Sequence, residues 1–299
     1  MILPIRLLGL PLALLAAGVL ASGGDLRAPP AQPLHIAITP LTQGQATDPQ
    51  FDAFYQRMVE ALPPPQRAER LLELSINGAK GAADYTLHHA QDWRGQLGSG
   101  ERLAAVIAVA MNSPRLEVRM AGFEVQLAQE NLATTPQEAE HLIARLHEDP
   151  HGVGAWMLYH LGLLAARGVE RARIVAVLVA TSHAQDVELR QWAVVALALS
   201  GGADAIAPLL SVAANDASAT IRERAFCGLA QSGTFHIAER YDAVPGLLAI
   251  ATDPRADRQN VAWSYQALRE ITGIRDLPDD PVAWRARLRE TGLLRGQQP

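Results

Sequence analysis

The sequence predicts an all-α fold, an α-solenoid of about five stacked helix-turn-helix repeats with a helical cap at each end. Leu and Ala dominate the apolar residues, while aromatic residues make up only 5% of the chain and strand-like alternation is scarce. Two similar stretches, 186–202 and 216–233, match at a spacing of 32 residues. Residues 192–199 are apolar without a break, so this helix has no polar face and must be enclosed by neighbouring helices.

The first 21 residues are typical of a signal peptide. A short positive region at Arg6 precedes fourteen apolar residues, 7–20, and Val19 and Ala21 occupy the positions that a signal peptidase reads. A membrane-spanning helix needs about 20 apolar residues, more than this run offers. We therefore expect export, to the periplasm or outside the cell. The alternative is an uncleaved signal anchor, which is the one membrane contact that we expect.

Two segments separate the signal peptide from the repeats. Residues 22–50 are rich in Pro and Gln without helical periodicity, which predicts a linker. Residues 51–100 predict an N-terminal helical cap of two or three helices, broken by the prolines at 63–65 and by the turn sequence at 77–81.

Each predicted repeat consists of two helices joined by a turn. An Asp before the second helix suits an N-cap, and a Gly after it suits a left-handed C-cap. Weaker copies, at periods of 32 to 39 residues, extend the repeats over 101–273, with the extra length assigned to a loop at 234–242. The pairs that match at a spacing of 32 are Leu189 and Ile221, Arg190 and Arg222, Ala193 and Ala225, Leu197 and Leu229, and Gly201 and Gly233.

The repeats resemble the HEAT-repeat family. The motif that carries the resemblance is an Asp, then an aliphatic residue followed by Arg, then small residues ahead of a Leu. The repeats are also similar to the HEAT-like repeats of phycobilin lyases. Exported bacterial HEAT-repeat proteins of uncharacterised function are similar in the stretches WRGQL, RERAFCGLAQSG and ALREITG.

The last segment, residues 274–299, predicts a capping helix and tail. Asp280 suits an N-cap, Pro281 the first helical position and Gly292 the position after the helix end. The helix is charged on one side, as the outer end of a solenoid requires for solubility.

Four residues occupy one position of successive repeats, five residues before the leucine of each repeat: Trp156, Trp192, Arg224 and Trp263. Trp and Arg are enriched in binding hot spots, so these residues are candidates for a protein-binding surface on the second helices. The alternative is structural, in which the indoles fill the space between repeats and Arg224 reaches outward along its aliphatic stem.

A second recurring set consists of acidic and basic residues: Asp186, Arg190, Asp216 and Arg222. We expect them to bond to one another or to neighbouring loops as a structural ladder along the repeats, with Asp253 in place to take part. The alternative is that the two arginines bind an anion.

Residue patterns for catalysis or metal binding are weak. Cys227, the only cysteine, takes a position that Val195 and Tyr159 hold in earlier repeats, which predicts a packing role and excludes an intramolecular disulfide. His147 and Glu148 form the one adjacent His-Glu pair, whereas the HEAT-like deoxyhypusine hydroxylases bind iron through several such pairs. We expect no catalytic residue, no metal and no cofactor.

The sequence therefore predicts a non-catalytic protein-binding or scaffolding protein of an extracytoplasmic compartment. Two alternatives stay open, an enzyme of the HEAT-like lyase or metal-dependent hydroxylase type and a purely structural part of an envelope complex. The net charge of −5 and the lack of a basic cluster exclude nucleic acid as a partner, because binding phosphates needs concentrated Lys and Arg.

Overall fold

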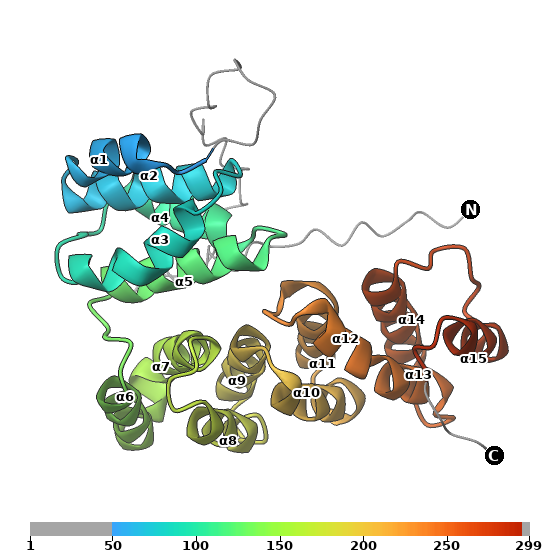
Figure 1. Cartoon of the computed structure of the whole chain (residues 1–299). Coiled ribbons are helices and arrows are strands. Elements are labelled where there is room, and N and C mark those ends of the chain that lie inside the picture. The colour runs from blue at the N-terminus through green and yellow to red at the C-terminus, as the bar shows by residue number, and fades with distance from the viewer. Residues whose placement is uncertain (1–49, 295–299) are drawn as a thin grey trace. The chain divides into compact units, whose positions relative to one another are not determined.

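The computed structural model describes residues 50–294, which form two compact units, 50–133 and 134–294 (Figure 1). Both units are helical, and the regular β structure in this range is a single bridge between Gln50 and Lys80. The predicted all-α class is confirmed.

Some of the predicted features lie outside the described residues. They are the signal peptide over 1–21, the linker over 22–50 except for its last residue, and the tail over 295–299. Within the range that the structure describes, no helix is long and apolar enough to cross a membrane.

The first unit is built from five α-helices and one 3₁₀ turn. They are α1 (Ala53–Glu60), α2 (Pro64–Ile76), α3 (Ala82–His89), η2 (Ala90–Trp93), α4 (Glu101–Met111) and α5 (Leu116–Gln129). Two chain breaks fall where the sequence predicts them. Pro64 opens α2 at a position that needs no backbone N–H, and Gly78 and Gly81 turn the chain before α3 with φ of +87° and +86°.

The boundary between the units differs from the predicted one. The sequence analysis ends the N-terminal cap at residue 100, whereas the structure divides the chain between Ala133 and Thr134. The reason is packing, because α4 and α5 share one buried apolar cluster with α2 and α3. Val106 of α4 and Val118 of α5 are fully buried in that cluster.

The second unit contains the remaining helices of the described range. They are α6 (Pro136–Glu148), α7 (Pro150–Ala166), α8 (Arg171–Thr181), α9 (Val187–Ser200), α10 (Ala203–Asn215), α11 (Ala219–Cys227), the π-turn η3 (Gly228–Ser232), α12 (Ile237–Asp242), α13 (Val244–Thr252), α14 (Arg258–Thr272) and α15 (Pro281–Glu290).

Consecutive helices of the second unit pack in pairs, α6 with α7, α8 with α9, α10 with α11, and α13 with α14. The second helices α7, α9, α11 and α14 also contact one another in that order, and the first helices α6, α8, α10 and α13 do the same (Figure 1). The unit therefore consists of two rows of helices. Residues 193–199 of α9 are buried, as their apolar sequence predicts, whereas Trp192 at the start of the apolar run is half-buried.

Small residues set the close approach between second helices. A Cβ on Gly162 of α7 would lie 2.8 Å from the carbonyl oxygen of Ala196 in α9, and a Cβ on Gly228 would lie 2.7 Å from the Cβ of Ala198. Neither position has room for a side chain. The backbone of α9 therefore lies close to those of α7 and η3 at these two glycines.

The segment around residues 228–242 departs from the predicted repeat. The expected left-handed glycine, Gly233, has a φ of −75°, and α11 gives way to the π-turn η3 after Cys227. Arg240 donates a hydrogen bond of 2.6 Å to the Gly233 carbonyl, so a different residue satisfies the carbonyls at this end. The expected loop contains the short helix α12, which His236 and Glu239 cap.

The C-terminal helix α15 lies where the sequence predicts a cap. The Asp280 carboxylate accepts hydrogen bonds from the backbone N–H groups of Val282 and Ala283. Trp284 is fully buried, and its indole N–H donates to the carbonyl of Pro278 at 3.0 Å. The helix is thereby fixed to the end of the second unit.

Candidate functional site

The first arginine of the predicted ladder connects two successive loops. Arg190 of α9 donates from Nε to the carboxylate of Asp216 at 3.0 Å. It also donates to the carbonyls of Ala184 and Gln185, both at 3.0 Å, in the loop before its own helix. Because Asp216 lies in the loop before α11, Arg190 connects the loop before α9 to the loop before α11.

Arg222 repeats this arrangement one helix pair later. It donates to the carboxylate of Asp257 at 2.7 Å and to the amide oxygen of Asn260 at 2.8 Å. It also donates to the backbone carbonyl of Asp216 at 2.8 Å. The result is a continuous chain of hydrogen bonds from Arg190 through Asp216 and Arg222 to Asp257, which we call the Arg–Asp ladder.

Two acids that were expected in the ladder, Asp186 and Asp253, form other contacts. Asp186 caps α9 and lies 3.3 Å from Nδ1 of His151, rather than bonding to an arginine of the ladder. Asp253 pairs with Arg255 at 2.9 Å. Because the connection between α13 and α14 (253–257) is longer than that between α10 and α11 (216–218), Asp257 takes the ladder position that the sequence analysis assigned to Asp253.

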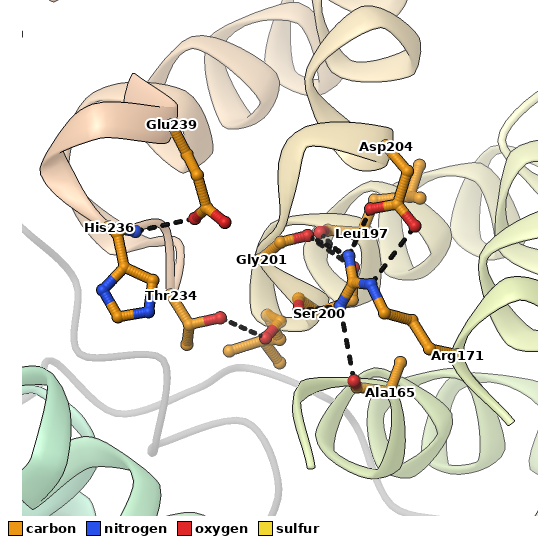
Figure 2. A network of polar contacts seen from close by, with 10 residues as sticks. Ala165, Arg171, Leu197, Ser200, Gly201, Asp204, Thr234, His236 and Glu239 are labelled. Atoms are coloured by element: carbon orange, nitrogen blue, oxygen red, sulfur yellow. Dashed lines mark hydrogen bonds and ion pairs between the residues drawn. The ribbon is translucent and has the colours of Figure 1, made fainter. Parts of the chain in front are cut away.

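A further arginine, which the sequence analysis did not single out, binds the ends of two second helices (Figure 2). Arg171, at the start of α8, donates to the carbonyl of Ser200 at 2.6 Å and to that of Ala165 at 3.3 Å. It also pairs with Asp204 of α10. The last carbonyls of a helix have no partner within the helix, so Arg171 satisfies them and joins neighbouring pairs.

The segment between η3 and α12 adds further hydrogen bonds to the end of α9. The Thr234 hydroxyl donates to the carbonyl of Leu199 at 2.6 Å, and the Thr234 backbone N–H donates to that of Ala198 at 3.0 Å. Figure 2 shows Thr234 beside the end of α9. A few residues later, the Glu239 carboxylate accepts from the backbone N–H of His236 at 2.8 Å. These contacts are structural, because each of them joins two residues of the chain.

The four candidate binding residues lie on the second helices at one repeated position, and we call them the Trp–Arg row: Trp156 on α7, Trp192 on α9, Arg224 on α11 and Trp263 on α14. Each of the four side chains is half-buried. The other two tryptophans of the chain, Trp93 and Trp284, are 3% and 0% exposed.

Each indole of the row meets another aromatic ring. The Trp192 ring packs edge-on against Tyr159 of α7 with centroids 6.3 Å apart, and Trp263 lies 6.0 Å from Phe226 of α11. Both contacts bridge neighbouring second helices. The indoles therefore fill space between helices along one edge and keep part of their surface open.

Arg224 differs from the ladder arginine on the same helix. The guanidinium of Arg222 is fully engaged by acceptors, whereas that of Arg224 makes no ion pair or hydrogen bond with any residue in the described part of the chain. Among the described residues, no acid is therefore paired with its charge.

His160 lies on the inner side of α7. It is 1% exposed, its ring stacks 4.3 Å from that of Trp156, and its Nδ1 bonds to the Trp156 carbonyl at 2.7 Å. Because a carbonyl only accepts, Nδ1 carries the proton, and the buried Nε2 has no hydrogen-bond partner among the residues that the structure describes. Burial lowers the pKa of His160 to about 4. The sequence analysis did not single out this residue.

The remaining candidates are less organised. Cys227 ends α11 half-buried, with its Sγ 3.6 Å from the Ser232 hydroxyl. A pocket of about 280 Å³ in the first unit has Lys80, Asp84, Arg115 and Glu117 around it, and charges of both signs select no ligand class. In the part of the chain that the structure describes, no group of three or more His, Cys, Asp or Glu side chains is placed to hold a metal.

No family model, no curated protein and no solved structure matches the chain. The functional interpretation therefore rests on the geometry of the second unit.

Proposed function

We propose that residues 134–294 belong to a HEAT-type α-solenoid, and that the protein is a non-catalytic binding or scaffolding protein. Its working surface is the Trp–Arg row on the second helices. The two rows of helices support the solenoid, and so does the Arg–Asp ladder, whose arrangement at Arg190 of α9 is repeated at Arg222 of α11.

The observation that carries the binding proposal is the half-burial of three indoles at one repeated position. An indole kept only for packing is expected to be enclosed, as Trp284 is. Partly open tryptophans held by neighbouring rings are rigid, and they offer a large contact area at low cost in conformational entropy. Such groups are the usual anchors of protein interfaces.

The location is part of the proposal. A signal peptide over residues 1–21 would deliver the protein to the periplasm or outside the cell. The partner is then an envelope or secreted protein, and the stack of helices offers it a preformed surface.

Crosslinking in the native host tests this function. The full chain carries a C-terminal tag, and the captured proteins are identified and quantified by mass spectrometry. The paired sample is the double variant Trp192→Ala/Trp263→Ala. Its control is Val282→Ala, which removes an apolar side chain that is 69% exposed on α15, outside the row.

We expect one or two partners at steady stoichiometry, lost from the double variant and kept by the control. Retention of the same partners by the double variant would show that another surface binds them. An empty capture with the unaltered chain, repeated under mild conditions, would contradict the binding function.

A further inference from the structure

We propose that Arg224 recognises a carboxylate of the partner, so that the row binds an acidic segment with an apolar side chain on each side of the acid. This inference rests on the proposed function and names the chemistry of the partner at the same surface.

The first support is the uncompensated charge. The Arg224 side chain is half-buried and forms no ion pair or hydrogen bond with any described residue. A guanidinium in such a place gains more from a carboxylate than one in open solvent, because fork-shaped pairing with an acid is both strong and directional. An acidic group is therefore the natural complement at this position.

The second support is that the aspartates Asp216 and Asp257, in the nearby loops, are already paired with other arginines. The Asp216 carboxylate, in the loop before α11, is bonded by Arg190, and the Asp257 carboxylate, in the loop before α14, is bonded by Arg222. The Arg–Asp ladder thus engages one aspartate in the loop before α11 and one in the loop before α14. The charge of Arg224 is left for a partner.

The third support is the flanking aromatic surface. Helix α11 contacts α9 on one side and α14 on the other, and these helices carry Trp192 and Trp263 at the position equivalent to Arg224. Neighbouring helix axes lie about 8–10 Å apart. An extended peptide rises about 3.3 Å per residue, so an apolar residue about three positions before and after the acid reaches each indole.

The test uses the purified full chain and a phage-displayed library of random twelve-residue peptides. Recovered peptides are synthesised, and their affinities are measured by fluorescence anisotropy. Each peptide is compared with a version in which its acid is replaced by the corresponding amide. The protein variants are Arg224→Gln, Arg224→Lys and, as a matched control, Arg285→Gln, which alters an exposed arginine on α15.

We expect enriched peptides to carry an acid between two apolar residues. Their affinity falls at least tenfold with Arg224→Gln or with the amide peptide, is partly kept by Arg224→Lys, and is unchanged with Arg285→Gln. Equal melting temperatures for the variants exclude misfolding as the cause.

Two results would overturn the inference. Peptides that bind without a preference for acids, or equally well to Arg224→Gln, remove the carboxylate contact while the proposed binding function stands. A library that yields no specific binder also contradicts the inference, and the capture in the native host then decides independently whether the binding function stands.

Discussion

Arg190 on α9 and Asp216 in the loop before α11 form a hydrogen-bonded ion pair of 3.0 Å across 26 residues of sequence. Their side chains are only 14% and 6% exposed. The pair joins two successive helix pairs, and because both charges are largely removed from water, each depends on the other.

Arg190→Met is expected to lower the free energy of unfolding by about 3 kcal/mol, because it leaves the Asp216 charge buried without its partner. Chemical denaturation at neutral pH measures the change. The control is Arg255→Met, which breaks the Asp253 pair at an arginine that is 87% exposed and is expected to have no measurable effect. Equal effects of the two variants would contradict the structural importance of the Arg–Asp ladder.

The buried His160 predicts a loss of stability in mild acid. Its pKa is about 4 in the folded protein and about 6.5 when unfolded, so the unfolded chain binds the proton first as the pH falls. Stability is complete above about pH 6.5 and falls toward pH 4, by about 3 kcal/mol in total from this group.

Unfolding free energies of the unaltered chain and of His160→Phe, measured between pH 7 and pH 4.5, check this contribution. We expect a shallower pH dependence in the variant, because an apolar ring does not take up the proton. His88→Gln, at a side chain 66% exposed, is the control and keeps the slope of the unaltered chain. Parallel curves for all three proteins would argue against a neutral, buried His160.

Gly162→Ala tests the close contact between α7 and α9. Alanine favours a helix over glycine by about 1 kcal/mol, but its Cβ would lie 2.8 Å from a backbone oxygen of Ala196. We expect the clash to dominate and to reduce stability by about 1–3 kcal/mol in thermal or chemical unfolding. Gly100→Ala, where no atom lies within 4 Å of the new Cβ, is the control. A stabilised Gly162→Ala would mean that the two helices are further apart.

The tryptophans are expected to separate into two groups. Trp284→Ala empties a fully buried site and also removes a hydrogen bond to the Pro278 carbonyl, so it lowers stability by about 3–5 kcal/mol. Trp192→Ala removes a half-buried ring, and we expect a smaller loss of about 1 kcal/mol together with a drop of at least tenfold in partner binding. Comparable losses of stability would assign Trp192 to the core.

Much of the second unit was predictable from the sequence. The Asp–aliphatic–Arg motif occurs in two successive repeats, where it predicted helix pairs and a ladder that includes Arg190 and Arg222. The position of Asp257 in that ladder was missed, because the longer connection before it shifts the register. The helix α12 was missed because His236 is an unusual N-cap residue.

Other features depend on tertiary contacts that a single sequence does not contain. The hydrogen bonds from Arg171 to the last carbonyls of α7 and α9 are one of these features. They could not be predicted, because an arginine in the first turn of a helix has no fixed partner. The boundary between Ala133 and Thr134 was another, because it depends on which apolar helices share a core. The row of Trp156, Trp192, Arg224 and Trp263 was found by alignment alone, and the half-burial of its members emerged only from the fold.

Site-specific photocrosslinking in the native host tests the role of the Trp–Arg row most directly. Benzoylphenylalanine is placed at Trp192 and Trp263 and, on the first helices, at the exposed Ala176 of α8 and Ala207 of α10. We predict one partner adduct of the same mass from both tryptophan positions and none from the two alanine positions. Adducts that form only at Ala176 or Ala207, or at none of the four positions, would contradict the assignment of the row as the binding surface.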